Sequence, residues 1–410
     1  MNAYSLPPLP QNAMPEPTRE TLSPTDRRAL AAVAVQFFVN GALPASFIPR
    51  LPEIRDQVDI SVAGVGLLIS IAGLTGLLGS ALVGPAVARF GTRRVMLNAG
   101  VVISISLGVI GVAEVPAVLL IGLMGMMAFD VMVDVPMNMQ ASWISARRHT
   151  PVMNRLHGLW SLGTLVGGLS AASIAAAGVS LTAHLIAAGI VLLSVLWFVG
   201  SNLLRTDESP NRSAEPRTVQ GRVSPVLILF ALTGLFALTL ESTASDWAAF
   251  RLVDDFGASP GFAGLGYIAA TGGMTVGRLA GDWASVRLGR YRLLLTAVAL
   301  TGSGFALATL TSNRYITLLG YLITGLGTAT LLPRLYDDAA KLPGMPGAGL
   351  GALTAGIRLG TIAIPVAVGA LAASALSVGG AVAVVTLPSV VAFLVVVLAL
   401  RRTAGVFGES

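Results

Sequence analysis

The chain has 410 residues, of which 54% are hydrophobic and only 11% are charged. A soluble domain carries about 25% charged residues, so this composition excludes an ordinary soluble protein and indicates an integral membrane protein. The sequence contains no cysteine, which excludes disulfides and thiolate metal sites, and its three scattered histidines disfavour a histidine-rich metal site. No cofactor is therefore expected.

The N-terminal residues 1–26 are rich in Pro, Ser, Thr and charge, and no apolar segment follows a basic start. They are predicted to form a disordered cytoplasmic tail and not a signal peptide. A membrane-spanning helix needs about 20 mostly apolar residues. Twelve such segments are predicted, at 28–48, 61–84, 95–113, 117–142, 156–178, 181–203, 224–244, 261–283, 291–310, 316–336, 348–373 and 378–400.

The first predicted span contains two amides, Gln36 and Asn40, beside Gly41. Residues four apart share one face of a helix. Amides inside a span commonly serve helix packing, and they can also bind a sugar or an amide. The sequence leaves these two roles open.

The segment after the second span reads "GPAVARFGTRRVM" and contains Gly84, Arg89, Gly91, Arg93 and Arg94. Glycine permits a tight turn between two helices. Arginines just outside the membrane can pair with carboxylates or with the C-termini of neighbouring helices. We interpret this motif either as a cytoplasmic gate, whose contacts break when the gate opens, or as anchoring by positive charge.

The fourth predicted span carries Asp130, Asp134 and Asn138 at four-residue intervals, so the three side chains share one helix face. A charge at the centre of a bilayer costs roughly 2.5–3.5 kcal/mol on insertion scales and usually faces a cavity or a partner. Pro136 frees the carbonyl of Met132 from its helical hydrogen bond. The two carboxylates lie about 5–6 Å apart on a helix and do not both ionise easily. This pattern suits proton binding and release, and a structural salt bridge or a solvated patch is the alternative.

Other polar residues fall in the fifth, seventh and eleventh spans. Trp160 and His157 begin the fifth span, where Trp160 either packs at the interface or stacks on a sugar ring. In the seventh span Glu241 is a candidate for a cavity, whereas Asp246 is consistent with an exposed helix end. Arg358 is the one basic residue predicted near the middle of a span. It needs a partner, either a membrane carboxylate or an anionic group of the substrate.

The basic residues predict the orientation of the chain. With the N-terminus inside, 20 of the 26 basic residues fall in cytoplasmic segments and 4 in external segments. This positive-inside distribution requires an even number of spans and two cytoplasmic ends. The net charge of +6 therefore reports membrane topology and not a nucleic-acid surface.

The longest polar stretch between spans, residues 204–223, divides six spans from six. We predict an N-terminal bundle at 27–203, a cytoplasmic linker at 204–223, a C-terminal bundle at 224–402 and a tail at 403–410. The two halves share a motif, because "RFGTRR" at 89–94 and "RLGRYR" at 287–292 are separated by 198 residues and follow the second span of each half. Such a match indicates an internal repeat, which is a transporter architecture.

These motifs resemble those of the major facilitator superfamily, whose motif between spans two and three is a glycine, three residues, an acid and then Arg-x-Gly-Arg-Arg. This chain has Gly84 but Ala88 in place of the acid, which puts the usual charge relay of the N-terminal half in doubt. In the C-terminal half Asp282 supplies an acid ahead of Arg287 and Gly289. The resemblance extends roughly over residues 27 to 402.

The resemblance implies an all-α membrane protein with twelve transmembrane helices in two six-helix bundles, in which spans one, four, seven and ten line a cavity. Within the superfamily, "DVPMNMQASW", "HGLWSLGTLVGG" and "ESTASDWAAFRL" look similar to the bacterial branch related to fucose–proton symporters. Asp130 and Asp134 are the candidates for proton coupling. The candidates for substrate binding are Gln36, Asn40, Asn138, Trp160, Glu241 and Arg358.

The sequence predicts a monomeric secondary transporter of the inner membrane that works by alternating access, with a proton and a small polar, sugar-like solute as its partners. Proton-driven efflux of an amphipathic drug or organic anion is one alternative, and a membrane sensor or scaffold is another. An enzyme is not expected, because no convergent set of His, Ser or metal ligands occurs within the spans. The sole lysine is Lys341 and no G-x-x-x-x-G-K-[ST] motif occurs, which argues against an ATP-driven pump.

Overall fold

The computed structural model describes residues 23–148, 152–205, 224–342 and 347–404. Most of the two predicted tails and of the predicted linker lies outside these residues. Helices account for nearly all of the described chain, and no strand occurs in it. The N-terminal half contains α1 (Pro24–Ala45), η1 (Ile48–Arg50), α2 (Leu51–Val58), α3 (Val62–Phe90), α4 (Thr92–Gly111), α5 (Pro116–Arg148), α6 (Met153–Ala176) and α7 (Leu181–Gly200).

The C-terminal half repeats this order with one additional break. It contains α8 (Pro225–Asp246), α9 (Ala248–Phe256), α10 (Pro260–Leu288), α11 (Arg290–Leu310), α12 (Arg314–Thr328), α13 (Leu331–Ala340), α14 (Ala348–Ala372) and α15 (Val378–Ala404).

Eleven helical segments of the described chain are long and apolar enough to cross a membrane. The eighth predicted span corresponds to α10, which is not among these eleven, although its 29 residues extend about 43 Å at 1.5 Å per residue. The tenth predicted span is interrupted, because α12 ends at Thr328 and α13 begins at Leu331. Pro333 contributes to the break, because it has no N–H to donate to the carbonyl of Ala329, although other prolines, such as Pro136 and Pro365, lie within helices that continue.

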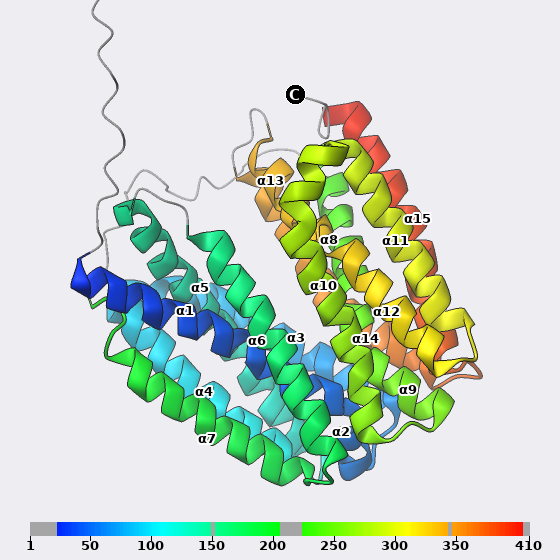
Figure 1. Cartoon of the computed structure of the whole chain (residues 1–410), viewed down its shortest axis with the longest axis horizontal. Coiled ribbons are helices and arrows are strands. Elements are labelled where there is room, and N and C mark those ends of the chain that lie inside the picture. Colours follow the sequence, from blue (N-terminus) through cyan, green and yellow to red (C-terminus); the bar gives the residue numbers. More distant parts are fainter. Residues whose placement is uncertain (1–22, 149–151, 206–223, 343–346, 405–410) are drawn as a thin grey trace, which may run out of the picture.

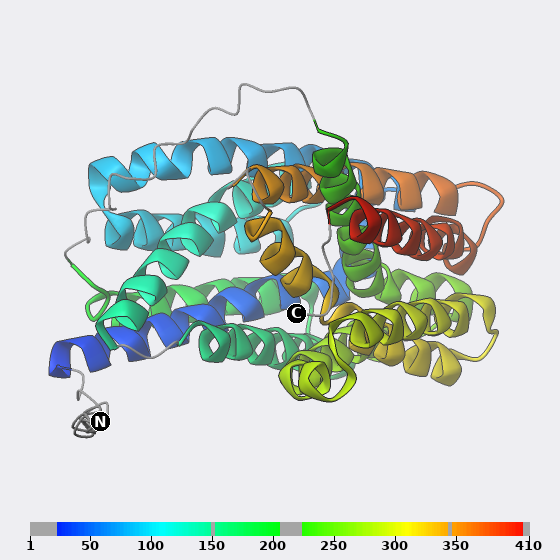
Figure 2. The same ribbon diagram turned by 90° about the horizontal axis from the view of Figure 1, so that it is seen from above.

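The two halves form two bundles that lie side by side (Figures 1 and 2). Two long helix pairs make most of the contact between them, α3 with α14 and α6 with α10, and α2 contacts α9. We call the two long pairs the two seams. We call the end where α7 ends and α8 begins the linker face, and the opposite end, where α2 and α9 lie, the far face (Figure 1).

Matching turns in the two halves support the repeat seen in the sequence. Asp59 ends α2 with φ 54° and Gly257 ends α9 with φ 62°, both in the left-handed region. Gly91 and Gly289 separate the next two helices of each half with φ 81° and 74°. Both pairs are 198 residues apart, the same separation as the arginine motifs. The conformation of Gly91 and Gly289 is one that side chains with a Cβ rarely adopt.

Candidate functional site

Polar side chains of α1, α5 and α6 meet inside the N-terminal bundle. Asn40 donates from Nδ2 to Asp130 Oδ1 at 3.2 Å. Trp160 donates from Nε1 to the Oδ1 of the same Asn40 at 3.0 Å. The amide of Asn40 is thus held at both ends, which fixes the indole of Trp160 relative to Asp130. Asn40 is 6% exposed, so these bonds form in the protein interior.

A second set of polar contacts is centred on Arg278 of α10, whose side chain reaches α6 of the other bundle. Arg278 Nη2 lies 3.1 Å from Glu241 Oε1, and Nη1 donates to Ser161 Oγ at 3.4 Å. The guanidinium carbon of Arg278 lies 5.7 Å from the centroid of the Trp160 ring, within the range of a cation–π contact. We call Asn40, Asp130, Trp160, Glu241 and Arg278 the central cluster.

Arg278 corrects one expectation. Arg358 was predicted as the one basic residue near the middle of a span, and this is wrong, because Arg278 is the nineteenth of the 29 residues of α10. Its charge within a predicted span was the available signal. Its role was missed because a single span gives no information on which residue of another helix it meets.

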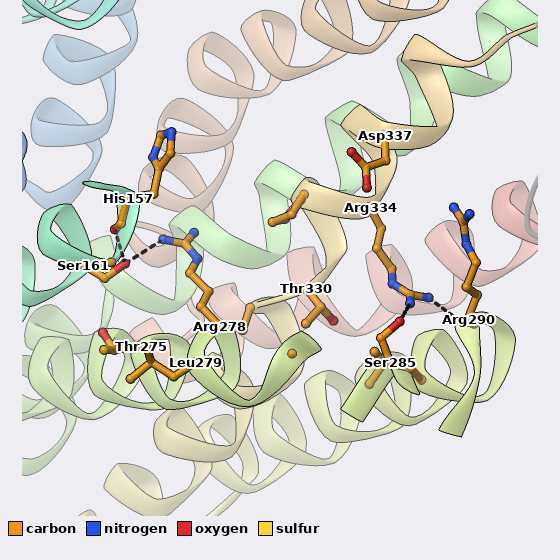
Figure 3. Close-up of a pocket in the computed structure, with 15 residues that line it drawn as sticks. His157, Ser161, Thr275, Arg278, Leu279, Ser285, Arg290, Thr330, Arg334 and Asp337 are labelled. Carbon is orange, nitrogen blue, oxygen red and sulfur yellow. Dashed lines mark hydrogen bonds between the residues drawn. The ribbon is translucent and has the colours of Figure 1, made fainter. Parts of the chain in front are cut away.

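The central cluster adjoins two cavities. The smaller has a volume of about 180 Å³ and lies between α1, α6, α8 and α10. Its polar lining includes Trp160, Ser161, Thr164, Glu241, Ser242, Ser245, Tyr267, Thr271, Thr275 and Arg278. The larger, of about 390 Å³, lies toward the linker face and shares Ser161, Thr275 and Arg278 with the smaller one (Figure 3). Polar groups from both bundles therefore line two adjacent cavities.

One carboxylate oxygen of Glu241 accepts no hydrogen bond from the described residues. Its Oε1 pairs with Arg278, but its Oε2 is buried and has no hydrogen-bond partner within the described part of the chain. A buried acceptor without a partner costs about 1–3 kcal/mol. A water molecule or a donor group of a bound solute would remove this cost.

Asp134 and Asn138 form a separate local contact on α5. Asn138 donates from Nδ2 to Asp134 Oδ1 at 3.0 Å and to the Asp134 carbonyl at 2.9 Å. The carboxylates of Asp130 and Asp134 are close enough to interact electrostatically, and the charge of Arg358 acts on both. Of these two carboxylates, Asp130 is hydrogen-bonded to another helix, whereas Asp134 is bonded only within α5 among the described residues. This difference distinguishes two carboxylates that the sequence left equivalent.

Arg358 lies on the other seam, where its Nη2 donates to Ser80 Oγ on α3 at 3.1 Å. Across the described residues no carboxylate oxygen lies within 4 Å of its guanidinium. Of the two predicted kinds of partner, a membrane carboxylate is therefore not in direct contact, and the attraction to Asp130 and Asp134 acts over a longer distance. Gln36 is 4% exposed within α1, and no hydrogen bond of its side chain is found in the described chain.

The arginines of the linker-face motif differ in their contacts. Arg93 donates from Nε to the carbonyl of Gly200 at 2.7 Å, at the C-terminus of α7. Arg89 and Arg287 are exposed and lie over aromatic rings of their own helices, Phe90 at 5.2 Å and Trp283 at 5.4 Å. Arg94 is also exposed. The side chain of Asp282 lies outside the described residues, so the predicted C-terminal charge relay keeps the status of a prediction.

The seam between α3 and α14 is tight at the far face and widens toward the linker face. A Cβ atom added to Gly66 would lie 2.2 Å from a backbone oxygen of α14. The nearest atom of α14 would be 3.5 Å away at Gly73 and 3.8 Å away at Gly76. At Gly84, near the linker face, no atom would lie within 4 Å.

The seam between α6 and α10 widens in the same direction. An added Cβ would lie 2.5 Å from α6 at Gly261, and 2.9 Å from α10 at Gly168. The distance from α6 rises to 3.7 Å at Gly272, and Gly158 near the linker face meets no atom within 4 Å. Both seams are thus closed at the far face and open at the linker face, which is the side of the larger cavity.

Comparisons with known proteins agree with this architecture. The family model described as Major Facilitator Superfamily matches residues 31–250. An MFS-type transporter of Yersinia pestis is 30% identical over 354 residues, covering 86% of this chain and 91% of that protein. The membrane protein MosC of Rhizobium meliloti is 26% identical over 321 residues, covering 78% of this chain and 77% of that protein.

Two solved structures share the fold. The nucleoside transporter NupG superposes with a TM-score of 0.69 at 13% identity, covering 95% of this chain and all of that one. A bacterial homologue of the human lysosomal transporter Spinster, in an inward-facing and occupied conformation, superposes with a TM-score of 0.62 at 15% identity. It covers 94% of this chain and 97% of that one.

Proposed function

Because the chain belongs to the major facilitator superfamily of membrane transporters, we propose that it moves a small polar solute across the membrane by alternating access, driven by a proton gradient. The chain is a transporter and not an enzyme. The observation that carries the proposal is the chain of contacts from Asp130 through Asn40 and Trp160 to Arg278 and Glu241, which links a carboxylate of each bundle across a seam beside a cavity.

We assign proton coupling to Asp130, with Asp134 as the neighbour that disfavours simultaneous ionisation of both carboxylates. The bond to Asn40 supports this choice, because Asn40 also holds Trp160 at the cavity. A proton on Asp130 weakens the charge-assisted bond from Asn40, and this change reaches Trp160. Substrate and proton would then favour each other's binding, which is a coupling free energy between two sites.

The solute is proposed to be neutral, hydroxylated and ring-containing. The indole of Trp160 offers a surface for stacking, and Glu241 Oε2 offers an acceptor for a hydroxyl group. The three motifs similar to fucose–proton symporters support a sugar-like solute. The fold shared with a nucleoside transporter is compatible with a sugar-containing ring compound.

Export of an organic anion is the second candidate, and one observation favours it. Arg358 faces the seam between α3 and α14 without a carboxylate within 4 Å among the described residues. Such a cation could bind an anionic solute. The attraction of Asp130 and Asp134, however, offsets part of this charge. The third alternative, a sensor or scaffold without transport, is disfavoured by the match to the transporter family.

We further propose that residues 27–203 and 224–402 are the two moving bundles and that the linker face is cytoplasmic, in the inner membrane of a bacterial cell. The 20 to 4 distribution of basic residues supports this orientation. Reporter fusions at the C-terminus and within the linker are expected to read the cytoplasmic side. An external signal at either position would contradict the twelve-span topology.

A thermal-shift screen of the purified protein tests the solute class directly, with sugars, polyols, nucleosides and organic anions as probes. A hit among neutral hydroxylated compounds supports the leading proposal, and a hit among organic anions supports export. Uptake of the hit into proteoliposomes under an imposed pH gradient separates a transporter from a scaffold. Stabilisation without uptake, in either direction of the gradient, would refute transport.

A further inference from the structure

We infer that Arg55 and Asp254 form a gate that holds the far face closed, and that Asp56 is the partner Arg55 keeps when this gate opens. The inference rests on the alternating access proposed above. It concerns residues that touch neither cavity, and it identifies what stabilises the state in which the far face is shut.

The contact joins the two bundles directly. Arg55 Nη1 on α2 donates to both carboxylate oxygens of Asp254 on α9, at 2.8 and 2.6 Å. The guanidinium carbon also lies 5.5 Å from the centroid of the Phe250 ring on α9. Arg55 is 13% exposed and Asp254 is 22% exposed. Water therefore screens this pair less than a fully exposed one.

Among the ion pairs of the described residues, this is the one that connects the two halves. It lies at the far face, at the same end as the tight contacts of Gly66 and Gly261. Both seams widen away from it toward the linker face. An attraction at this end closes the far face and leaves the linker face free to open.

The second partner of Arg55 makes the contact reversible. Arg55 Nε donates to Asp56 Oδ1 at 2.8 Å, and Asp56 belongs to the same helix and is 62% exposed. When α9 moves away, Arg55 keeps this carboxylate and gains water. The arginine is then never an unpaired buried charge, which would be strongly destabilising. The barrier to opening is reduced by this arrangement.

Two other arginines of the far face have a different role. Arg50 is 2% exposed and pairs with Glu53 on its own half, and it also donates to the carbonyl of Val179. Arg251 pairs with Asp255, again within one half. These pairs stabilise the individual bundles, so they provide a contrast to Arg55, whose bond to Asp254 depends on how the bundles sit relative to each other.

The test needs no knowledge of the substrate. The chain has no cysteine, so Thr275→Cys introduces a single thiol at a position that lines both cavities. A membrane-impermeant maleimide is applied to oriented vesicles from the far side and, separately, from the linker side. The labelling rate from each side measures how often that face opens.

Asp254→Asn in this background removes the charge of the cross-bundle partner. We expect labelling from the far side to become about fivefold faster, the change that corresponds to losing about 1 kcal/mol of one ion pair. Labelling from the linker side should not rise. Asp56→Asn is the matched control, because it removes a carboxylate from Arg55 without touching the cross-bundle bond, and it should leave far-side labelling unaccelerated.

Three outcomes would overturn the gate. The first is far-side labelling that is unchanged in Asp254→Asn. The second is faster labelling from both sides, which indicates partial unfolding. The third is equal acceleration in Asp56→Asn. Gly261→Trp separates the gate from alternating access itself, because a bulky side chain at that tight contact forces the far face apart. If far-side labelling rises in Gly261→Trp but not in Asp254→Asn, the gate is rejected and alternating access is retained. If far-side labelling rises in neither variant, both are rejected.

Discussion

Replacing Asp130 with Asn should abolish proton-driven accumulation and preserve exchange of the solute across the membrane. The amide is nearly the same size as the carboxylate, and its oxygen can still accept the bond from Asn40, which is 3.2 Å long in the native chain. This bond is weakened, as it is when Asp130 is protonated, but Asn40 still accepts from Trp160. The lost energy is the difference between a bond to an ionised group, about 1.5–3 kcal/mol, and a neutral one, about 1 kcal/mol.

The expected accumulation can be calculated. One pH unit corresponds to 1.36 kcal/mol per proton, so a neutral solute moved with one proton accumulates at most about tenfold when the membrane potential is held at zero. Asp130→Asn should reach a ratio of about one in the same proteoliposomes. Counterflow exchange of labelled against unlabelled solute, which needs no net proton movement, should remain measurable.

Two control variants sharpen the interpretation. Asp134→Asn should accumulate solute and show at most a weaker affinity, because Asp134 bonds within its own helix. Asp130→Ala removes the acceptor as well as the charge, leaves Asn40 Nδ2 without its partner and should cost about 1–3 kcal/mol in stability. Full tenfold accumulation by Asp130→Asn would refute the assignment, and Glu241 would then be the next carboxylate to test.

The other predictions concern the cavity, the packing and the motif. Trp160→Phe removes the hydrogen-bond donor to Asn40 and weakens the contact with Arg278. The affinity for the solute found in the screen, measured by thermal-shift titration, should therefore fall about tenfold. An unchanged affinity would show that the solute binds elsewhere. Gly356→Ala should lower thermal stability by about 1–3 kcal/mol, because its Cβ would lie 1.8 Å from a backbone oxygen of α8. In the control variant Gly84→Ala the Cβ meets no atom within 4 Å, so this variant should melt at the same temperature as the parent protein. Arg89→Ala or Arg287→Ala should slow transport more than it lowers membrane abundance, measured by uptake and immunoblot in parallel, and a loss of abundance alone would identify these arginines as anchors.

The sequence alone determined the class of the protein and the positions of its long helices, but not the short helices α2 and α9. A bilayer offers no hydrogen bonds to the backbone, so an apolar segment of sufficient length has to form a helix. The predicted spans accordingly agree with the helices to within a few residues at most ends, as for α14 at Ala348–Ala372 against 348–373. The matching turns at Gly91 and Gly289 were likewise evident as a repeated motif. The break before α13 was not predicted, and Pro333 alone did not signal it, because Pro136 and Pro365 lie within helices that continue.

The tertiary structure alone decided which polar residues meet. Four-residue spacing placed Asp130 and Asp134 on one face, but only the packing of α1 against α5 gave Asp130 a bond to Asn40. Arg278 and Trp160 are 118 residues apart, and their contact depends on how α10 lies against α6. The periodicity of one helix specifies a direction around its own axis. It contains no information on the neighbour found in that direction, nor on which end of a seam is closed.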